Sequence, residues 1–264
     1  MKVAFVCVNF NNHQITLDYI KNVISIANEH EIKIIVIDND SKKDDLAALA
    51  TKMEQYPAAT LIKSIANKGY FNGLNQGIAW ALANGFSQYQ IIGNNDIEFE
   101  SDFLEKLQGI SLKDDELVIA PDVLTLTGIH ENPHIINGVS RLRKMMYAIY
   151  YSHYYIAKII MLFYSDERKA KTFDPEKKYI YMGIGALYVL TPHFFKHFNQ
   201  LWDKLFLYGE EAVFGGQIRS VNGKIVYEPS LKCYHNESAT TSKMSSRHKY
   251  EVVRSSYKIY KKYL

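Results

Sequence analysis

Short apolar runs that alternate with helix-compatible stretches constrain the fold of this chain more than any other feature. Within the first hundred residues the expected strands are 3–8, 32–37, 59–65 and 89–93, and the expected helices are 14–30, 44–55 and 73–83. Continuous β-branched strands of this kind are typical of parallel sheets that are covered on both faces. The alternation therefore predicts an α/β protein with a doubly wound, mostly parallel, Rossmann-like central sheet and helices on both faces.

The second half of the chain is less regular. It contains an apolar run at 118–123, two strand-like runs around the glycines of 179–192, and a helix expected from about Glu210 to Ser220. Two short strands, 224–229 and 231–236, follow. No internal repeat or linker rich in Pro, Gly or Ser separates the halves, so we expect one domain, 1–264, with halves 1–105 and 106–264.

Composition narrows the possible partners and compartments. The net charge of +3 over 264 residues gives no support to a nucleic-acid partner, and none is expected. Cys7 and Cys233 lie far apart in apolar runs, which is typical of reduced core residues in a cytoplasmic protein. The N-terminus resembles a first strand more than a signal peptide, and no apolar run reaches the roughly 20 residues of a membrane span.

Each expected strand of the first half ends in a polar motif. VNFNN, DNDS, ANKGYFNG and NNDIE follow the four strands in turn. In doubly wound sheets the ligand site lies at the carboxyl ends of the strands, so these motifs predict a site at one edge. None of them is a dinucleotide fingerprint or a Walker loop.

The second and third motifs each allow two interpretations. Asp38 either belongs to a helix-capping loop or accepts hydrogen bonds from a base or ribose. The next motif crowds Asn67, Gly69, Asn72 and Gly73 into a short loop. Glycines permit close approach of the backbone and asparagines supply uncharged donors and acceptors, so ligand binding is favoured there over a simple turn.

The fourth motif places a carboxylate at the end of a buried strand. Asn94, Asn95 and Asp96 offer one carboxylate flanked by neutral oxygens, which suits Mg²⁺ or Mn²⁺ completed by substrate phosphates and water. The alternative is a cap for the helix expected near Ser101, a role that Ser101 itself fills better. Metal binding is therefore the favoured interpretation.

Three further ionisable residues stand at element ends. Glu210 and Glu211 open a helix, where they either complement the helix dipole or supply a general base. His235 ends a strand and is either structural or a contact for pyrophosphate or metal.

Taken in order, the motifs CVNFNN, IDNDS, NKGYFNGLNQGI, NNDIEF, LFLYGEE and YHNESATTS resemble those of the inverting family 2 glycosyltransferases. Within that family they are similar to the bacterial branch of rhamnosyltransferases and related enzymes of surface-polysaccharide assembly. The resemblance extends from Val3 to about Ser242. It implies a GT-A fold with a nucleotide-sugar-binding half, 1–105, and a smaller acceptor-side lobe within 106–264.

The resemblance also implies roles for individual residues. The donor would be a dTDP- or UDP-sugar and the acceptor a hydroxyl of a glycan, expected to be lipid-linked. Asp96 would bind the metal on the diphosphate, His235 would steady the diphosphate or metal, and Glu211 would be the base, supported by Glu210. The residues implied to bind the nucleotide sugar are Asn9, Asn11, Asp38, Asn67, Gly69, Asn72, Asn94 and Asn95.

The chain departs from the family pattern at three positions. Asn94 replaces the first acid of the Asp-x-Asp element, and Val213 and Gln217 replace an acid and an arginine that usually follow the acidic pair. These departures leave a non-catalytic nucleotide-sugar-binding module as an alternative. A nucleotidyltransferase would need a Gly-rich basic loop after the first strand, which VNFNN lacks.

An aromatic segment, 141–164, begins with three cations and contains six tyrosines and no acid. It predicts either a helix packed on the catalytic lobe or a helix in a membrane interface, and a dimer contact is equally compatible. The segment 249–264 is a second basic, Tyr-rich helix. Peripheral contact with the inner face of the cell membrane is therefore an expectation for both.

Overall fold

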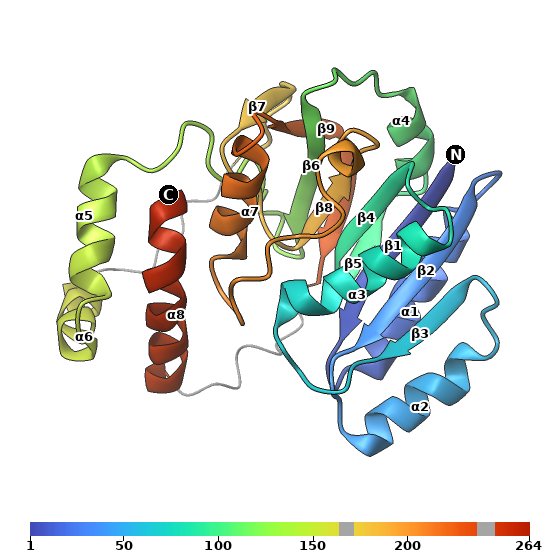
Figure 1. The fold of residues 1–264 in the computed structure, drawn as a ribbon, viewed down its shortest axis with the longest axis horizontal. Coiled ribbons are helices and arrows are strands. Elements are labelled where there is room, and N and C mark those ends of the chain that lie inside the picture. The colour runs from blue at the N-terminus through green and yellow to red at the C-terminus, as the bar shows by residue number, and fades with distance from the viewer. Residues whose placement is uncertain (164–171, 237–245) are drawn as a thin grey trace.

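A computed structural model describes residues 1–163, 172–236 and 246–264, and Figure 1 shows an α/β fold around one central sheet. The described strands follow the order β3-β2-β1-β4-β8-β6-β9-β5, with β7 paired to β9. Their bounds are β1 Lys2–Asn9, β2 Glu31–Asp38, β3 Ala59–Lys63, β4 Tyr89–Asn94, β5 Ile97–Phe99, β6 Glu116–Thr125, β7 Lys178–Ile180, β8 Leu187–Leu190 and β9 Lys224–His235.

Helices cover both faces of this sheet, as the alternation predicted. The helices are α1 His13–Ser25, α2 Lys43–Met53, α3 Tyr70–Ala83, α4 Phe103–Gly109, α5 Arg141–Tyr150, α6 Tyr154–Phe163, α7 Glu210–Arg219 and α8 Ser246–Tyr260, with short 3₁₀ turns at Phe194–Lys196 and Lys261–Tyr263. One core forms under α1, α2 and α4, a second under α3 and α7, and a smaller third between α7 and α8. The prediction of a doubly covered α/β sheet is confirmed.

The first four strands are parallel and end side by side. β1 pairs in parallel with β2 and β4, and β2 pairs in parallel with β3. The register sets Asn9 opposite Asp38 and Val8 opposite Asn94. The polar motifs therefore converge at one edge of the sheet. Beyond β4 the sheet becomes mixed, because β8 is antiparallel to both β4 and β6.

Several element boundaries differ from those expected, and α1, for example, ends at Ser25 rather than His30. α3 begins at Tyr70 rather than near Gly73. The two strands expected at 224–236 are one strand, β9, whose pairing with β6 shifts between Glu228 and Lys232. Pro229 lies in that shift and has no amide hydrogen for a ladder, which explains an irregularity at the point where the sequence suggested a break.

The aromatic segment is also divided, into α5 and α6, and its last residue, Tyr164, lies outside the described residues. Figure 1 shows α5, α6 and α8 grouped at the end of the molecule opposite β3 and α2. Among the described residues, no helix combines the length and apolar character needed to cross a bilayer. Cys7 and Cys233 are buried and unbridged, as expected.

Candidate active site

A buried hydrogen-bond network joins the ends of β1 and β2. The amide nitrogen of Asn9 lies 2.8 Å from Oδ2 of Asp38 and 3.1 Å from Oδ2 of Asp45, and it also contacts Ser41. Thr16 donates from its hydroxyl to the amide oxygen of Asn9 at 2.8 Å. Asn9 is fully buried and Asp38 is 1% exposed. These two predicted nucleotide-binding residues are the last residues of β1 and β2, and they form the buried inner layer of the candidate site.

Asn11 joins the loop that follows β1 to the loop that follows β2. It adopts a left-handed backbone conformation, with φ of 58°. Its N–H donates to the hydroxyl of Ser41 at 2.9 Å, and its side-chain oxygen accepts from the N–H of Lys42 at 2.8 Å. Asn11 is half-buried, so it lies nearer to solvent than Asn9 does.

The loop before α3 is shaped around Gly69. Asn67 accepts from the N–H of Gly69 at 3.1 Å and from the side chain of Asn39 at 3.0 Å. Gly69 has φ of 105°, and a Cβ on it would lie 2.5 Å from the carbonyl oxygen of Phe206. Only glycine fits both the conformation and the close approach, so this loop is fixed against the segment that leads to α7.

Two asparagines of the same motif have a structural partner. Asn72 donates to the carboxylate of Asp203 at 2.9 Å, and Asn75 exchanges two hydrogen bonds with the main chain of Leu201. Part of the asparagine content that suggested a ligand loop therefore holds the segment 201–206 in place. The sequence did not reveal these partners because they are more than a hundred positions away.

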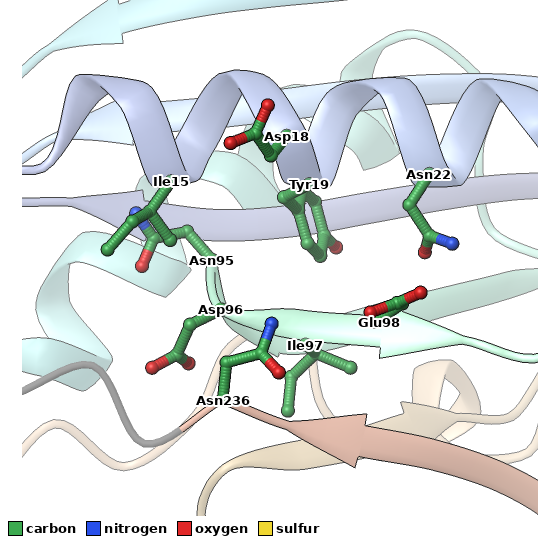
Figure 2. A pocket seen from close by; sticks show the side chains of 9 residues that line it. All are labelled: Ile15, Asp18, Tyr19, Asn22, Asn95, Asp96, Ile97, Glu98 and Asn236. Carbon is green, nitrogen blue, oxygen red and sulfur yellow. The ribbon is translucent and has the colours of Figure 1, made fainter. Parts of the chain in front are cut away.

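The side chains of the fourth motif point in two directions, that of Asn95 toward α1 and that of Asp96 toward the end of β9. Asn95 donates to the hydroxyl of Thr16 at 2.7 Å, toward α1. Figure 2 shows Asn95 beside Ile15 and Asp96 on the other side of the turn, near Asn236. A pocket of about 290 Å³ opens here, lined by Ile15, Asp18, Tyr19, Asn22, Asn95, Asp96, Ile97, Glu98 and Asn236. Asp96 is only 6% exposed, so its carboxylate stands at the inner wall.

His235 lies between two carboxylates. Its Nε2 is 3.4 Å from Oδ1 of Asp96, and its Nδ1 is 2.8 Å from Oε2 of Glu131. Nε2 is also 3.2 Å from the amide of Asn94. Burial opposes a charge on the ring, but the hydrogen bonds to Asp96 and Glu131 outweigh it and raise the pKa of His235 to about 10.

This arrangement suits a divalent metal with few protein ligands. No group of three or more His, Cys, Asp or Glu residues that could hold a metal occurs among the described residues. Asp96 and Nε2 of His235 nevertheless face each other, and Glu131 holds Nδ1, as carboxylates hold metal-bound histidines. A metal in place of the Nε2 proton would take two protein ligands and complete its shell with phosphate and water.

The acidic pair begins α7 after an unusual turn. Tyr208 and Gly209 are both left-handed, with φ of 68° and 93°. Glu210 is 6% exposed, and burial together with the charge of Glu211 raises its pKa to about 8. Glu211 is less buried, and a Cβ on Gly185 would lie 2.8 Å from its Oε1. Burial raises the pKa of Glu211 as well. Hydrogen bonds from the backbone N–H groups of Glu211 and Gly185 lower this pKa but do not cancel the effect of burial.

Tyr70 connects the acidic pair with Asp96. It is the first residue of α3, and its hydroxyl lies 3.5 Å from the carbonyl oxygen of Gly185. Burial raises the pKa of Tyr70 well above its usual value, and the charges of Asp96 and Glu210 raise it further. The charge of the candidate metal ligand, Asp96, and that of the candidate base, Glu211, therefore both act on this phenol. The sequence contained no signal for this role of Tyr70.

The C-terminal helix supports the turn that carries the acidic pair. A Cβ on Gly209 would lie 2.2 Å from the ring of Tyr260, so α8 packs directly against this turn. Ser256 donates from its hydroxyl to the carbonyl oxygen of Leu207 at 2.6 Å. The sequence suggested only a membrane or surface role for this helix, because its partners are not visible in the residue pattern.

Two departures from the family pattern have a packing explanation. Val213 is fully buried between α7 and α8. Gln217 is also buried, donates to the carbonyl oxygen of Gln200 and accepts from the N–H of Trp202, both at 2.8 Å. These positions stabilise the helix and the segment 200–202. The motif residues from Glu237 to Ser242 lie outside the described residues.

Comparisons with solved structures identify this architecture as the GT-A fold. GalNAc-T7 with UDP, GalNAc and Mn²⁺ is 15% identical with a TM-score of 0.61, over 89% of this chain and 44% of that one. The mannosyltransferase PcManGT from Pyrobaculum calidifontis, with GDP-Man and Mn²⁺, is 13% identical with a TM-score of 0.56, over 90% and 57%. TarS from S. aureus is 10% identical with a TM-score of 0.57, over 90% and 37%. The chain spans less than two thirds of each of these proteins.

The family comparison is consistent with this fold. No curated protein matches the chain. The family model described as Glycosyl transferase family 2 matches residues 5–166, which is more than half of the chain and includes the strand-end motifs up to Asp96. The chain belongs to glycosyltransferase family 2.

Proposed function

We propose that the chain is a metal-dependent, inverting hexosyltransferase that moves a sugar from a nucleotide-diphosphate donor to a hydroxyl of a glycan. The observation that carries this proposal is the Asp96–His235 pair at 3.4 Å, together with the acidic pair Glu210 and Glu211, whose charges act with that of Asp96 on Tyr70. A carboxylate–histidine pair can hold a metal that neutralises the leaving group and a further carboxylate can act as the base, and both assist a single displacement.

The nucleoside is proposed to bind at the edge formed by β1, β2 and the loop before α3. Asn11 and Asn67 are half-buried there, and Gly69 holds this loop against the backbone of Phe206. Asn9 has no exposed surface, so its contribution would be to hold the carboxylate of Asp38. Asn72, Asn94 and Asn95 complete the proposed donor site, with Asn94 nearest to the metal ligands.

Asp96 and His235 are proposed to hold Mn²⁺ or Mg²⁺, which would neutralise the leaving nucleoside diphosphate. Two of the structural neighbours, GalNAc-T7 and PcManGT, are described in complex with Mn²⁺, which supports this choice. An imidazole ligand also favours a transition metal over Mg²⁺, because Mg²⁺ is usually bound by oxygen ligands.

Glu211 is proposed as the base. Its carboxylate would take the proton of the acceptor hydroxyl while that oxygen bonds to the anomeric carbon and the bond from this carbon to the diphosphate oxygen breaks. Attack from the opposite face inverts the configuration. Burial raises the pKa of both members of the acidic pair, that of Glu210 to about 8, which brings these carboxylates closer to the range in which a base can take up a proton near neutral pH.

The donor and acceptor are proposed from the resemblance of the motifs. A dTDP- or UDP-sugar is the expected donor, and a lipid-linked glycan of bacterial capsule, O-antigen or exopolysaccharide assembly is the expected acceptor, as in rhamnosyltransferases. Such an acceptor would bring a cytoplasmic enzyme to the inner face of the cell membrane as a peripheral protein.

The role of Glu211 can be tested by following donor turnover with Mn²⁺ in Glu211→Gln. Loss of a general base is expected to lower the rate by about 10²- to 10⁴-fold while donor binding remains. Glu29→Gln, at an exposed acid in the turn before β2 and away from the strand-end loops, is the control and should keep the wild-type rate. Equal rates in wild type and Glu211→Gln would contradict the assignment.

A non-catalytic nucleotide-sugar-binding module is the alternative. Asn94 favours it, because it removes the first acid of the metal-binding element. Val213 and Gln217 no longer favour it, since packing explains both. Saturable donor binding without turnover on any acceptor, unchanged in Glu211→Gln, would support this alternative.

A further inference from the structure

The outer face of α6 is apolar and exposed. Tyr155, Ile156, Ile159, Leu162 and Phe163 follow the spacing i, i+1, i+4, i+7 and i+8, which places them on one side of a helix. Their exposed fractions run from 40% for Ile156 to 85% for Phe163. Ala157, on the opposite side, is 1% exposed. The helix therefore presents an apolar stripe to the outside of the molecule.

A second stripe lies on α5. Leu142, Met145, Met146 and Ile149 follow the spacing i, i+3, i+4 and i+7 and are between 45% and 64% exposed. None of the residues of α5 is buried. Together the two stripes contain nine exposed large apolar or aromatic side chains, which we call the α5–α6 surface. Contiguous apolar exposure of this kind marks an interaction site.

The opposite faces of both helices are held by α8. Tyr250 donates to the carbonyl oxygen of Tyr150 at 3.0 Å, and Arg254 donates to that of Tyr151. The ring of Tyr151 lies 4.6 Å from that of Tyr257, and the ring of Tyr154 lies 5.3 Å from that of Tyr250. The two helices are therefore fixed to the molecule by the sides opposite their exposed stripes, and Figure 1 shows both helices with α8 at one end of the fold.

Charge distinguishes between the possible partners of this surface. The range 141–163 contains four cations, Arg141, Arg143, Lys144 and Lys158, and no acid. In a symmetric dimer the same patch would meet itself and bring cations against cations. An anionic lipid surface instead complements the cations and accepts the apolar side chains.

We propose that the α5–α6 surface binds in the plane of an anionic lipid bilayer. Each helix has ten residues, or about 15 Å, against a hydrocarbon core of about 30 Å, so neither would cross it. The apolar stripes enter the interface, and the cations and tyrosines lie at headgroup level. This proposal rests on the proposed function in one respect: membrane binding would bring the enzyme to its proposed lipid-linked acceptor.

The test is co-sedimentation of the full chain with vesicles of phosphatidylcholine alone or with phosphatidylglycerol. The wild type should bind the anionic vesicles and lose affinity as salt is raised. The double variant Leu162→Ser with Phe163→Ser removes the two most exposed side chains of α6 and should bind at least about tenfold more weakly. Leu126→Ser, at a 73% exposed leucine of the β6 turn, is the matched control and should bind like wild type.

Two further measurements make the outcome decisive. Donor-induced thermal stabilisation should be equal in wild type and all variants, so a loss of vesicle binding is separable from a failure of the proposed function. Absence of wild-type binding to anionic vesicles, or binding that the double variant retains, would overturn the proposal. Sedimentation equilibrium that shows a dimer dissociated by the double variant, without vesicle binding, would assign the surface to a second copy.

Discussion

At the scale of single residues, Glu131 contributes to the site without contacting the reacting groups in the proposed mechanism. It lies 2.8 Å from Nδ1 of His235 and thereby directs Nε2 toward Asp96. Glu131→Gln is expected to weaken Mn²⁺ affinity by about 10- to 100-fold, because the ring loses its orientation and basicity. Metal titration in the presence of a nucleoside diphosphate measures this, with Glu29→Gln, at an exposed acid in the turn before β2, as the control. Unchanged affinity would show that Glu131 has no such role.

The acidic pair makes a pH-dependent contribution to stability. The pKa of Glu210 is raised to about 8 in the folded chain and is about 4.3 when unfolded, so the folded state holds the proton more tightly. This stabilisation is complete below about pH 4 and is lost as pH rises to about 8. The glutamine of Glu210→Gln cannot ionise. As pH rises over this range, the free energy of unfolding of the variant should therefore fall by at least about 1 kcal/mol less than that of the wild type.

Denaturant unfolding at a series of pH values tests this prediction. His235, with a pKa raised to about 10, also loses its stabilising contribution as pH rises, but from about pH 6.5 upward, and it does so equally in both proteins. Parallel stability curves for wild type and Glu210→Gln would contradict the raised pKa of Glu210.

The sequence allowed some of the candidate site residues to be predicted, but not others. Asp96 and Glu211 could be proposed because each is a carboxylate at the end of a recognisable element. Glu131 and Tyr70 could not, because their roles depend on contacts with His235 and Gly185, which are 104 and 115 positions away. The residue pattern also could not show that Asn9 is buried or that Asn72 contacts Asp203.

At the scale of elements, the turn between Leu207 and α7 depends on Gly209. Gly209→Ala should destabilise the fold by about 1–3 kcal/mol or more, because alanine is strained at φ of 93° and its Cβ would overlap the ring of Tyr260. Gly109→Ala, where a Cβ meets nothing within 4 Å, is the control. Thermal unfolding compares the melting temperatures of the two variants. Equal values would show that α8 moves to accommodate the added methyl group without loss of stability.

The sequence predicted strands most accurately where burial of apolar side chains alone determines them. β1, β2 and β4 are largely apolar and mostly buried, β3 is a half-buried edge strand, and all four were predicted. β9 was predicted as two strands because Pro229 and Ser230 interrupt its pattern, although pairing with β6, β7 and β5 keeps it one. The break between α5 and α6 has no Gly or Pro and instead coincides with packing of Tyr151 on α8.

At the scale of the whole molecule, α8 joins two regions that the sequence treated separately. One side of this helix holds α5 and α6 through Tyr250 and Arg254, and another side holds the turn before Glu210 through Ser256 and Tyr260. The proposed lipid contact and the proposed base are therefore attached to the same element. This connection depends on packing alone, so only the structure could reveal it.

The central claim is that the strand-end loops bind a nucleotide-diphosphate sugar through a metal held at Asp96. The most direct measurement is thermal stabilisation by a panel of nucleotide sugars, with and without Mn²⁺, for wild type and Asp96→Asn. At a hundredfold excess over Kd a true donor stabilises by about 2.7 kcal/mol. We expect one nucleotide series to stabilise the wild type only with Mn²⁺ and to lose this effect in Asp96→Asn. No stabilisation by any nucleotide sugar, or stabilisation independent of both Mn²⁺ and Asp96, would contradict the claim.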